Sequence, residues 1–386
     1  MKEIQYKRFS WNTHKKNWSL KRPNVCQFEL TFKCGLRCKH CYTDCYNKAD
    51  FIKNELDTKE VKSILDKVYK AGVIWLCFTG GDPLSREDFL ELYSYAKNKG
   101  FIVTIFTNGY SMTKRIADYL KKNPPFVIEL TLNGVTREAY ERISGVRGSF
   151  EKTRKGLNLI LERKLPLKIK TQVTKDNLEE LPKIKEFIEN LGLNFRPSAF
   201  LHARLDGNLT PCSLRIPPQE VLSLDGKKKR LVDDDCGLSL HATRSTLHAH
   251  LFRCAIGGGD GVNIDPYGNL IPCNCIREPK ESLFKESIEK ANKIILNWVR
   301  NRTSTTNSKC KGCLIKDLCY NCPGKAWLEE GDLEEPVEWF CQLAHLAVKD
   351  ANPVRNYSKL DKISISNGAN LTRINANRNS PTMRIS

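Results

Sequence analysis

The sequence predicts an α/β protein in which a parallel sheet is followed by a smaller cysteine-rich region. The first observation is that short runs of β-branched and aromatic residues alternate with helix-like periods along 25–208. The second is that cysteines gather within 254–350. Alternating strands and helices favour parallel strands joined by helical crossovers. A length of 386 residues allows one large domain and one smaller one.

The predicted elements follow one another regularly along the chain. Strands are expected at 24–32, 75–78, 101–106, 126–132, 167–173 and 194–200. Helices are expected at 57–69, 85–100, 113–121, 136–143, 150–163 and 178–190. Asp57 and Glu60 form a capping-box-like start to the first helix, and Ser85 is the predicted cap of the second. Six strand–helix units in a row indicate a parallel sheet.

Glycine or cysteine loops follow directly from four of these strands. The loops are 34–41, 80–83, 107–109 and 131–134. In α/β barrels the chemistry sits at the carboxyl ends of the strands. We therefore expect the four loops to converge on one face, although any one of them alone would pass for an ordinary turn.

The first loop carries three cysteines, Cys34, Cys38 and Cys41, at the spacing C-x3-C-x2-C. Three thiolates on one tight loop can hold three irons of a [4Fe–4S] cube, which leaves the fourth iron without a protein ligand. An iron that is open in this way can bind and reduce another molecule. A tetrahedral zinc site is the alternative, and it would take His40 or Cys45 as its fourth ligand.

This motif resembles the cluster motif of the radical S-adenosylmethionine (radical SAM) superfamily, with His40 in the place of the usual aromatic residue. The resemblance implies a partial (β/α)6, TIM-like barrel that is open on one side. It also implies that Cys34, Cys38 and Cys41 hold a catalytic cluster whose open iron chelates S-adenosylmethionine. Electron transfer would then cleave the sulfonium and form a 5′-deoxyadenosyl radical, which abstracts a hydrogen atom.

Two further loops resemble cofactor-binding segments of the same family. Gly80-Gly81-Asp82-Pro83 is similar to the family's Gly-Gly-Glu-Pro motif, which implies a contact with the methionyl amine. Thr131-Leu132-Asn133-Gly134 is similar to a Ser-x-Asp-Gly segment that faces the ribose, with an amide in place of the carboxylate. His40 and Asn108 are the remaining expected cofactor contacts.

The carboxyl-terminal cysteines resemble the SPASM domain, a cluster-binding extension of peptide-modifying radical SAM enzymes. They are Cys254, Cys273, Cys310, Cys313, Cys319, Cys322 and Cys341, and four residues separate Gly268 from Cys273. The central run ends in C-x2-C, whereas the family has C-x3-C. Two structural zinc sites are the alternative, because C-x2-C-x5-C-x2-C also suits zinc.

The resemblance implies two auxiliary [4Fe–4S] clusters. One would use Cys254, Cys273 and Cys322, and the other would use Cys310, Cys313, Cys319 and Cys341. The fourth ligand of the first cluster stays open. The candidates are His248, His250, Cys236 and Cys275, or an open iron that binds a substrate thiolate.

Composition narrows the class of protein. The mean hydropathy is −0.46, and no apolar run reaches the roughly 18 residues of a membrane span. Sixteen cysteines without an export signal favour metal binding in a reducing compartment, so a cytoplasmic location is expected. The net charge of +19 is spread along the chain and suits an acidic peptide. Nucleic acid is not an expected partner, because the sequence contains no recognised nucleic-acid module.

The predicted domains are an amino-terminal extension (1–24), a radical SAM barrel (25–208), a bridge (209–253), an auxiliary cluster domain (254–350) and a disordered tail (351–386). This layout resembles maturases of ribosomally made peptides, which form thioether or carbon–carbon links. The alternatives are an anaerobic sulfatase-maturating (formylglycine-generating) enzyme, a haem- or cofactor-biosynthetic enzyme, and a zinc-stabilised nucleic-acid-binding protein. Expected partners are a peptide or protein substrate, a flavodoxin or ferredoxin electron donor, and a separate peptide-recognition protein.

Overall fold

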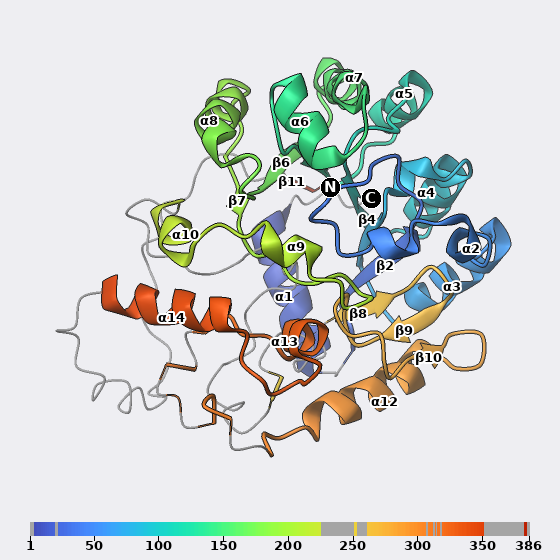
Figure 1. Cartoon of the computed structure of the whole chain (residues 1–386). Helices are drawn as coiled ribbons and strands as arrows, with labels where there is room; N and C mark the ends of the chain where they lie inside the picture. The colour runs from blue at the N-terminus through green and yellow to red at the C-terminus, as the bar shows by residue number, and fades with distance from the viewer. Residues whose placement is uncertain are drawn as a thin grey trace.

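The computed structural model describes residues 4–19, 22–224, 251–252, 261–305, 308–311, 313, 315–316, 319–350 and 382–383. Figure 1 shows helices α3 to α8 as an outer arc around the strands, with α12, α13 and α14 on another side of the molecule. The predicted α/β class is confirmed.

Six parallel strands form the partial barrel and are neighbours in chain order. They are β2 (Val25–Thr31), β3 (Trp75–Gly80), β4 (Ile102–Thr107), β5 (Val127–Thr131), β6 (Leu167–Gln172) and β7 (Pro197–Ser198). The last strand is much shorter than the predicted 194–200. Only Pro197 and Ser198 pair with β6, and Pro197 has no N–H to donate to a ladder.

The connecting helices cover the outside of the sheet with their apolar faces. They are α3 (Thr58–Lys70), α4 (Phe89–Asn98), α5 (Lys114–Lys122), α6 (Arg137–Ser144), α7 (Ser149–Glu162) and α8 (Leu181–Asn190). Val61, Ile64 and Leu65 of α3 are fully buried, and the predicted capping box at Asp57 is present. Burial of each such side chain stabilises the fold by about 1.5–3 kcal/mol.

The predicted helix cap at Ser85 is wrong. Ser85 ends a short 3-10 turn, η2 (Pro83–Ser85), and α4 begins only after Asp88. The reason is local: the Asp82 carboxylate accepts a hydrogen bond from the Leu84 N–H, which closes the tight turn before a helix can begin. The other short turns are η1 (Asp44–Tyr46), α2 (Ala49–Ile52) and η3 (Leu178–Glu180).

The cysteine-rich region adds strands to the barrel sheet, which the sequence did not predict. Strand β8 (Gly261–Ile264) pairs in parallel with β2, and β9 (Asn269–Ile271) and β10 (Glu281–Ser282) follow antiparallel. Among the described residues the sheet order is β10-β9-β8-β2-β3-β4-β5-β6-β7. The helices of this region are α12 (Ile288–Arg300), α13 (Pro323–Glu330) and α14 (Glu338–Asp350).

The bridge and the termini pack around this frame. The bridge contains α9 (Thr210–Ser213) and α10 (Pro218–Leu224), and α10 packs against α14. Helix α1 (Tyr6–Ser19) packs on the first residue of β3, where the Trp75 indole donates to the Tyr6 hydroxyl over 2.9 Å. Within the predicted tail, β11 (Thr382–Met383) pairs with β1 (Ile4–Gln5), and the rest of 351–386 lies outside the described residues.

Among the described residues, no helix combines the length and the apolar character that crossing a bilayer requires.

Candidate functional site

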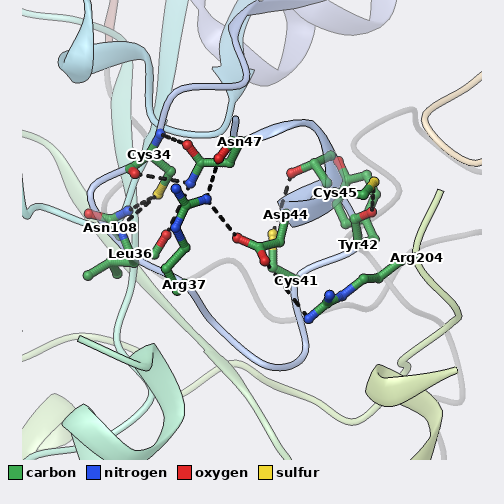
Figure 2. A network of polar contacts seen from close by, with 11 residues as sticks. Cys34, Leu36, Arg37, Cys41, Tyr42, Asp44, Cys45, Asn47, Asn108 and Arg204 are labelled. Atoms are coloured by element: carbon green, nitrogen blue, oxygen red, sulfur yellow. Dashed lines mark hydrogen bonds and ion pairs between the residues drawn. The ribbon is translucent and has the colours of Figure 1, made fainter. Parts of the chain in front are cut away.

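The three-cysteine loop leaves the carboxyl end of β2 and is held by one asparagine. The Asn47 side chain accepts from the Cys34 N–H over 3.2 Å and donates to the carbonyls of Cys34 and Leu36 (Figure 2). On its other side the loop reaches α6, where the Arg37 N–H donates to the Ser144 carbonyl over 2.8 Å. Asn47 was missed by sequence reasoning, because a single asparagine thirteen residues away carries no recognisable spacing.

The three cysteines of this loop are half-buried, and the charges of their ionised forms would interact. Burial raises the pKa of Cys34 to about 12, and it raises the pKa of Cys38 and Cys41 as well. The charges of Cys34 and Cys41 raise the pKa of Cys38 further. Thiols in such a place ionise when a metal cation compensates their charge. The donor set therefore fits an iron–sulfur cluster held by these three side chains.

The glycine loop lies directly on the backbone that enters the cysteine loop. The Gly81 N–H donates to the Thr31 carbonyl over 2.7 Å. A Cβ on Gly80 would lie 2.1 Å from the Thr31 carbonyl oxygen, and one on Gly81 would lie 2.4 Å from that of Phe32. Both positions therefore require glycine, and Gly80 also has a φ of +120°.

The Asp82 carboxylate is used inside the protein. It accepts from the Thr107 hydroxyl at 2.9 and 3.0 Å and from the N–H groups of Leu84 and Asn108. Burial raises the pKa of Asp82 to about 6. In this way Asp82 joins the ends of β3 and β4, while the neighbouring Pro83 is buried in the turn that follows.

Asn108 brings the third loop to the cluster site. Its side-chain amide donates to the Cys34 sulfur over 3.2 Å, as Figure 2 shows. The Oδ1 of the same side-chain amide accepts from the Tyr110 N–H over 2.8 Å, which fixes the orientation of the amide. The convergence of the second and third loops on the cysteine loop is therefore present in the structure.

His40 joins the fourth loop to the same face. Its Nε2 lies 3.4 Å from the Asn133 amide nitrogen, and the Asn133 oxygen accepts from the Gln172 N–H over 2.8 Å. Desolvation lowers the pKa of His40 to about 4, so the ring is neutral near pH 7. Its Nδ1 is buried and has no hydrogen-bond partner among the described residues. Thr131 ends β5 opposite Lys170.

The expected ligands of the second auxiliary cluster line one cavity. Cys310, Cys313, Cys319 and Cys341 surround a space of about 250 Å³, together with Lys311 and Lys316. The Asn321 N–H donates to the Cys319 sulfur over 3.4 Å, which is a contact suited to a thiolate. Three of these cysteines lie within ten residues of one another, and the fold brings Cys341 of α14 to the same cavity.

The expected ligands of the first auxiliary cluster are described in part. Cys273 follows β9, and Cys322 is the residue that precedes α13. Cys254, His248, His250 and Cys236 lie outside the described residues. In the described part of the chain, no three His, Cys, Asp or Glu side chains form a group that could hold a single metal ion.

The fold and the site define a class of enzyme: a partial α/β barrel with a three-cysteine cluster loop at the carboxyl ends of its strands. Residues 28–188 match the family model of the Radical SAM superfamily. These residues form a radical SAM domain, so the chain is an enzyme of the iron–sulfur and S-adenosylmethionine type. The alternative of a zinc-stabilised nucleic-acid-binding protein without catalysis is therefore set aside.

Two curated relatives point to different substrates. The AdoMet-dependent heme synthase of Methanosarcina barkeri is 26% identical over 81% of this chain and 95% of the relative. The PqqA peptide cyclase of Granulibacter bethesdensis is 32% identical over 64% of this chain and 66% of the relative. Against three further heme-related relatives, the chain spans less than half of their length, between 42% and 44%.

Solved structures show the same fold. The structure of Streptococcus suis SuiB bound to its precursor peptide SuiA aligns with a TM-score of 0.62. The alignment covers 87% of this chain and 80% of SuiB at 17% sequence identity. At that identity the similarity concerns the fold, which extends through the cysteine-rich region as well as the barrel.

Proposed function

We propose that this enzyme modifies a ribosomally made peptide by radical chemistry, forming a thioether or a carbon–carbon link. The observation that carries the proposal is the presence of two kinds of cysteine site in one chain. One site is the Cys34–Cys41 loop at the carboxyl end of β2, and the other is the four-cysteine cavity beside α14. The relatives SuiB, bound to a precursor peptide, and PqqA peptide cyclase support the substrate class.

The residues of the barrel would divide the work at the first site. Cys34, Cys38 and Cys41 would hold the cluster, which together with S-adenosylmethionine supplies a 5′-deoxyadenosyl radical that abstracts hydrogen. The backbone of the Gly80–Pro83 loop would take the methionyl amine. Its position against Thr31 and Phe32 supports this role, because only glycine allows the loop to lie there.

The ribose side of the cofactor would lie against the fourth loop. Asn133 is held by the Gln172 N–H and offers its amide N–H groups, and Thr131 offers a hydroxyl from the end of β5. His40 is neutral, with one ring nitrogen free of protein partners among the described residues, and could meet a cofactor hydroxyl.

The carboxyl-terminal cysteines would hold two auxiliary [4Fe–4S] clusters. When hydrogen abstraction leaves a radical on the substrate, closing a crosslink requires the loss of one electron, and an auxiliary cluster would accept it. Lys311 and Lys316 at the cavity of Cys310 and Cys341 favour negatively charged ligands there. An acidic leader peptide would suit the net charge of +19.

The proposal also implies partners. A flavodoxin or ferredoxin would supply the electron that starts the reaction, and a separate recognition protein would deliver the peptide. A sulfatase-maturating enzyme uses the same two-site layout on a protein substrate. A sulfatase encoded beside this chain would favour that assignment over a short precursor peptide.

A heme-forming reaction is the second candidate. It is favoured by the heme synthase of M. barkeri, which this chain matches over 95% of the relative's length. A porphyrin substrate carries carboxylates, so the basic charge of the chain does not separate the two candidates.

Anaerobic purification with iron and sulfide quantification tests the proposal first. About twelve irons per chain are expected for three [4Fe–4S] clusters. Dithionite and S-adenosylmethionine should then yield 5′-deoxyadenosine, and Cys38→Ala should abolish that yield while the circular dichroism spectrum is kept. 5′-Deoxyadenosine from Cys38→Ala would overturn the catalytic assignment.

A second pair of measurements distinguishes a peptide substrate from a porphyrin substrate. A precursor peptide encoded near this chain should lose two mass units for each crosslink, because two hydrogens leave when the new bond forms. Conversion of an iron porphyrin, with no mass change in any peptide, would support the heme candidate and end the peptide proposal.

A further inference from the structure

The described part of the first auxiliary site contains a cysteine that the family pattern does not use, Cys275. It lies in the tight turn after β9, in which the Cys273 N–H donates to the Ile276 carbonyl over 3.4 Å and the Ile276 N–H donates back over 3.2 Å. Cys273 and Cys275 are two residues apart in this short turn, which the Cys273–Ile276 pairing closes. Two thiols therefore come from a single turn.

The third thiol arrives from α13. Cys322 is the residue directly before this helix. The first turn of α13 lies against the cysteine turn, because a Cβ on Gly324 would come within 2.9 Å of the Cys275 Cβ. Gly324 thus lets the helix start, with Cys322 directly before it, approach Cys275.

His202 faces Cys275 from the barrel side. Its Nδ1 lies 2.8 Å from the Ala203 carbonyl, which can only accept, so the proton is on Nδ1. Nε2 then accepts from the Cys275 S–H, with 3.6 Å between nitrogen and sulfur.

His202 also connects this site to the radical SAM loop. Its ring lies 5.2 Å from the ring of Tyr42, which directly follows the cluster ligand Cys41. The Tyr42 carbonyl accepts from the Leu205 N–H over 3.0 Å, so the loop that carries His202 is tied to the cysteine loop. The position of His202 is therefore set by the barrel.

We propose that Cys275 is a thiolate ligand of the auxiliary iron–sulfur cluster held by Cys273 and Cys322, and that His202 positions its sulfur. This inference rests on the proposed function, which supplies the auxiliary clusters. Cys273, Cys275 and Cys322 are then three described thiolates that hold the cluster. On loading, the Cys275 S–H proton passes to the His202 Nε2 that accepts from it, and a sulfur–iron bond forms with no change in oxidation state, so that the ring then donates to the bound sulfur.

The test uses protein that lacks the radical SAM cluster. The background variant Cys34→Ala/Cys38→Ala/Cys41→Ala should retain about eight irons per chain in two auxiliary clusters. Added Cys275→Ser should either remove up to about four of these irons or convert one reduced-cluster electron paramagnetic resonance signal into a [3Fe–4S]-type signal. Added Cys212→Ser is the matched control, because Cys212 is a half-buried cysteine in the bridge, and it should leave both signals unchanged.

His202→Gln tests the positioning residue in the same background. We expect iron to be retained while the midpoint potential and the g values of one cluster shift, an effect that a purely structural role would not produce. His345→Gln, at the cavity of Cys310 and Cys341, is the control and should leave the potential of the cluster near His202 unchanged.

Failure of the Cys275 proposal can be distinguished from failure of the proposed auxiliary clusters. If the background variant holds about eight irons and Cys275→Ser leaves iron content and both spectra unaltered, this proposal is overturned while the auxiliary clusters stand. If the background variant holds no iron although the wild type cleaves S-adenosylmethionine, the auxiliary clusters and Cys275 fall together, and the radical enzyme remains.

Discussion

Glu29 and Arg277 form a bidentate ion pair inside the protein that joins the first barrel strand to the cysteine-rich region. The two nitrogen–oxygen distances are 2.5 and 3.0 Å, and the Glu29 side chain is 1% exposed. Arg277 also lies over the ring of Phe32, 5.6 Å from its centre. Glu29 lies five residues before Cys34 and Arg277 four residues after Cys273, so the pair ties the strand that leads into the cysteine loop to the segment that follows Cys273.

Removal of one partner of this pair should destabilise the whole molecule. Glu29→Gln is expected to lower the free energy of unfolding by about 3–5 kcal/mol, because it leaves the Arg277 charge buried and uncompensated. Anaerobic urea denaturation measures this loss. Glu278→Gln, in the exposed pair with Lys280, is the control and should change stability by less than about 1 kcal/mol. Equal losses in the two variants would contradict the coupling.

Asn108→Ala should alter the electronic properties of the cluster site. The variant loses the 3.2 Å hydrogen bond to the Cys34 sulfur, which stabilises the more negative, reduced state. A bond of about 1 kcal/mol corresponds to a midpoint potential roughly 40 mV more negative. Potentiometric titration checks this value, with the exposed Asn54→Ala as the control. An unchanged potential would mean that Asn108 does not contact the cluster ligand.

Gly81→Ala should weaken S-adenosylmethionine binding by about tenfold or more, which corresponds to ~1.4 kcal/mol. The new methyl group would lie 2.4 Å from the Phe32 carbonyl oxygen and would push the loop away from the cysteine site. Anaerobic equilibrium dialysis measures the affinity. Gly192→Ala is the control: it has positive φ but open space around it, so it should cost about 1–2 kcal/mol of stability and leave binding intact. Normal affinity in Gly81→Ala would remove this loop from the cofactor site.

Asp82 should make stability depend on pH. Burial raises its pKa to about 6, above that of the unfolded chain, so the folded protein holds this proton more tightly. The resulting stabilisation is complete below about pH 4 and is lost as the pH rises to about 6. Asp82→Asn should remove this loss. The free energy of unfolding of the variant, relative to wild type, should therefore rise by up to about 3 kcal/mol between pH 4 and 6.

Urea denaturation across this pH range measures the effect. Exposed Asp50→Asn is the control and should give a parallel curve. A constant difference between Asp82→Asn and wild type over the whole range would show that the Asp82 carboxyl is not perturbed by burial.

Local patterns predicted the parts of the molecule that local physics decides. Five of the six predicted barrel strands have nearly the expected bounds, because alternating apolar runs and turn residues act over a few residues. The capping box at Asp57 is present for the same reason. The predicted cap at Ser85 was wrong because the preceding proline and the Asp82 side chain stabilise a 3-10 turn there. Residue preferences alone do not tell whether such a turn or a helix start is more stable.

The site was predictable where its residues share a spacing. The cysteines at 34, 38 and 41 lie on one loop, and those at 310, 313, 319 and 341 line one cavity. Asn47 and His202 carry no such pattern. Each acts through one contact between segments, Asn47 on the Cys34 backbone and His202 on the Cys275 sulfur, and a single residue of that kind has no periodic signal.

The sequence by itself determined the chemistry of this protein: three thiols at cluster spacing, the glycine loop and the second set of cysteines. Only the tertiary structure decided that β8 pairs in parallel with β2, that Arg277 meets Glu29, and that Cys275 faces His202. The physical reason is the distance along the chain over which each interaction acts. Thiol spacing and turn residues act through neighbouring bonds, whereas pairing across more than two hundred residues depends on the burial and hydrogen bonding of the whole sheet.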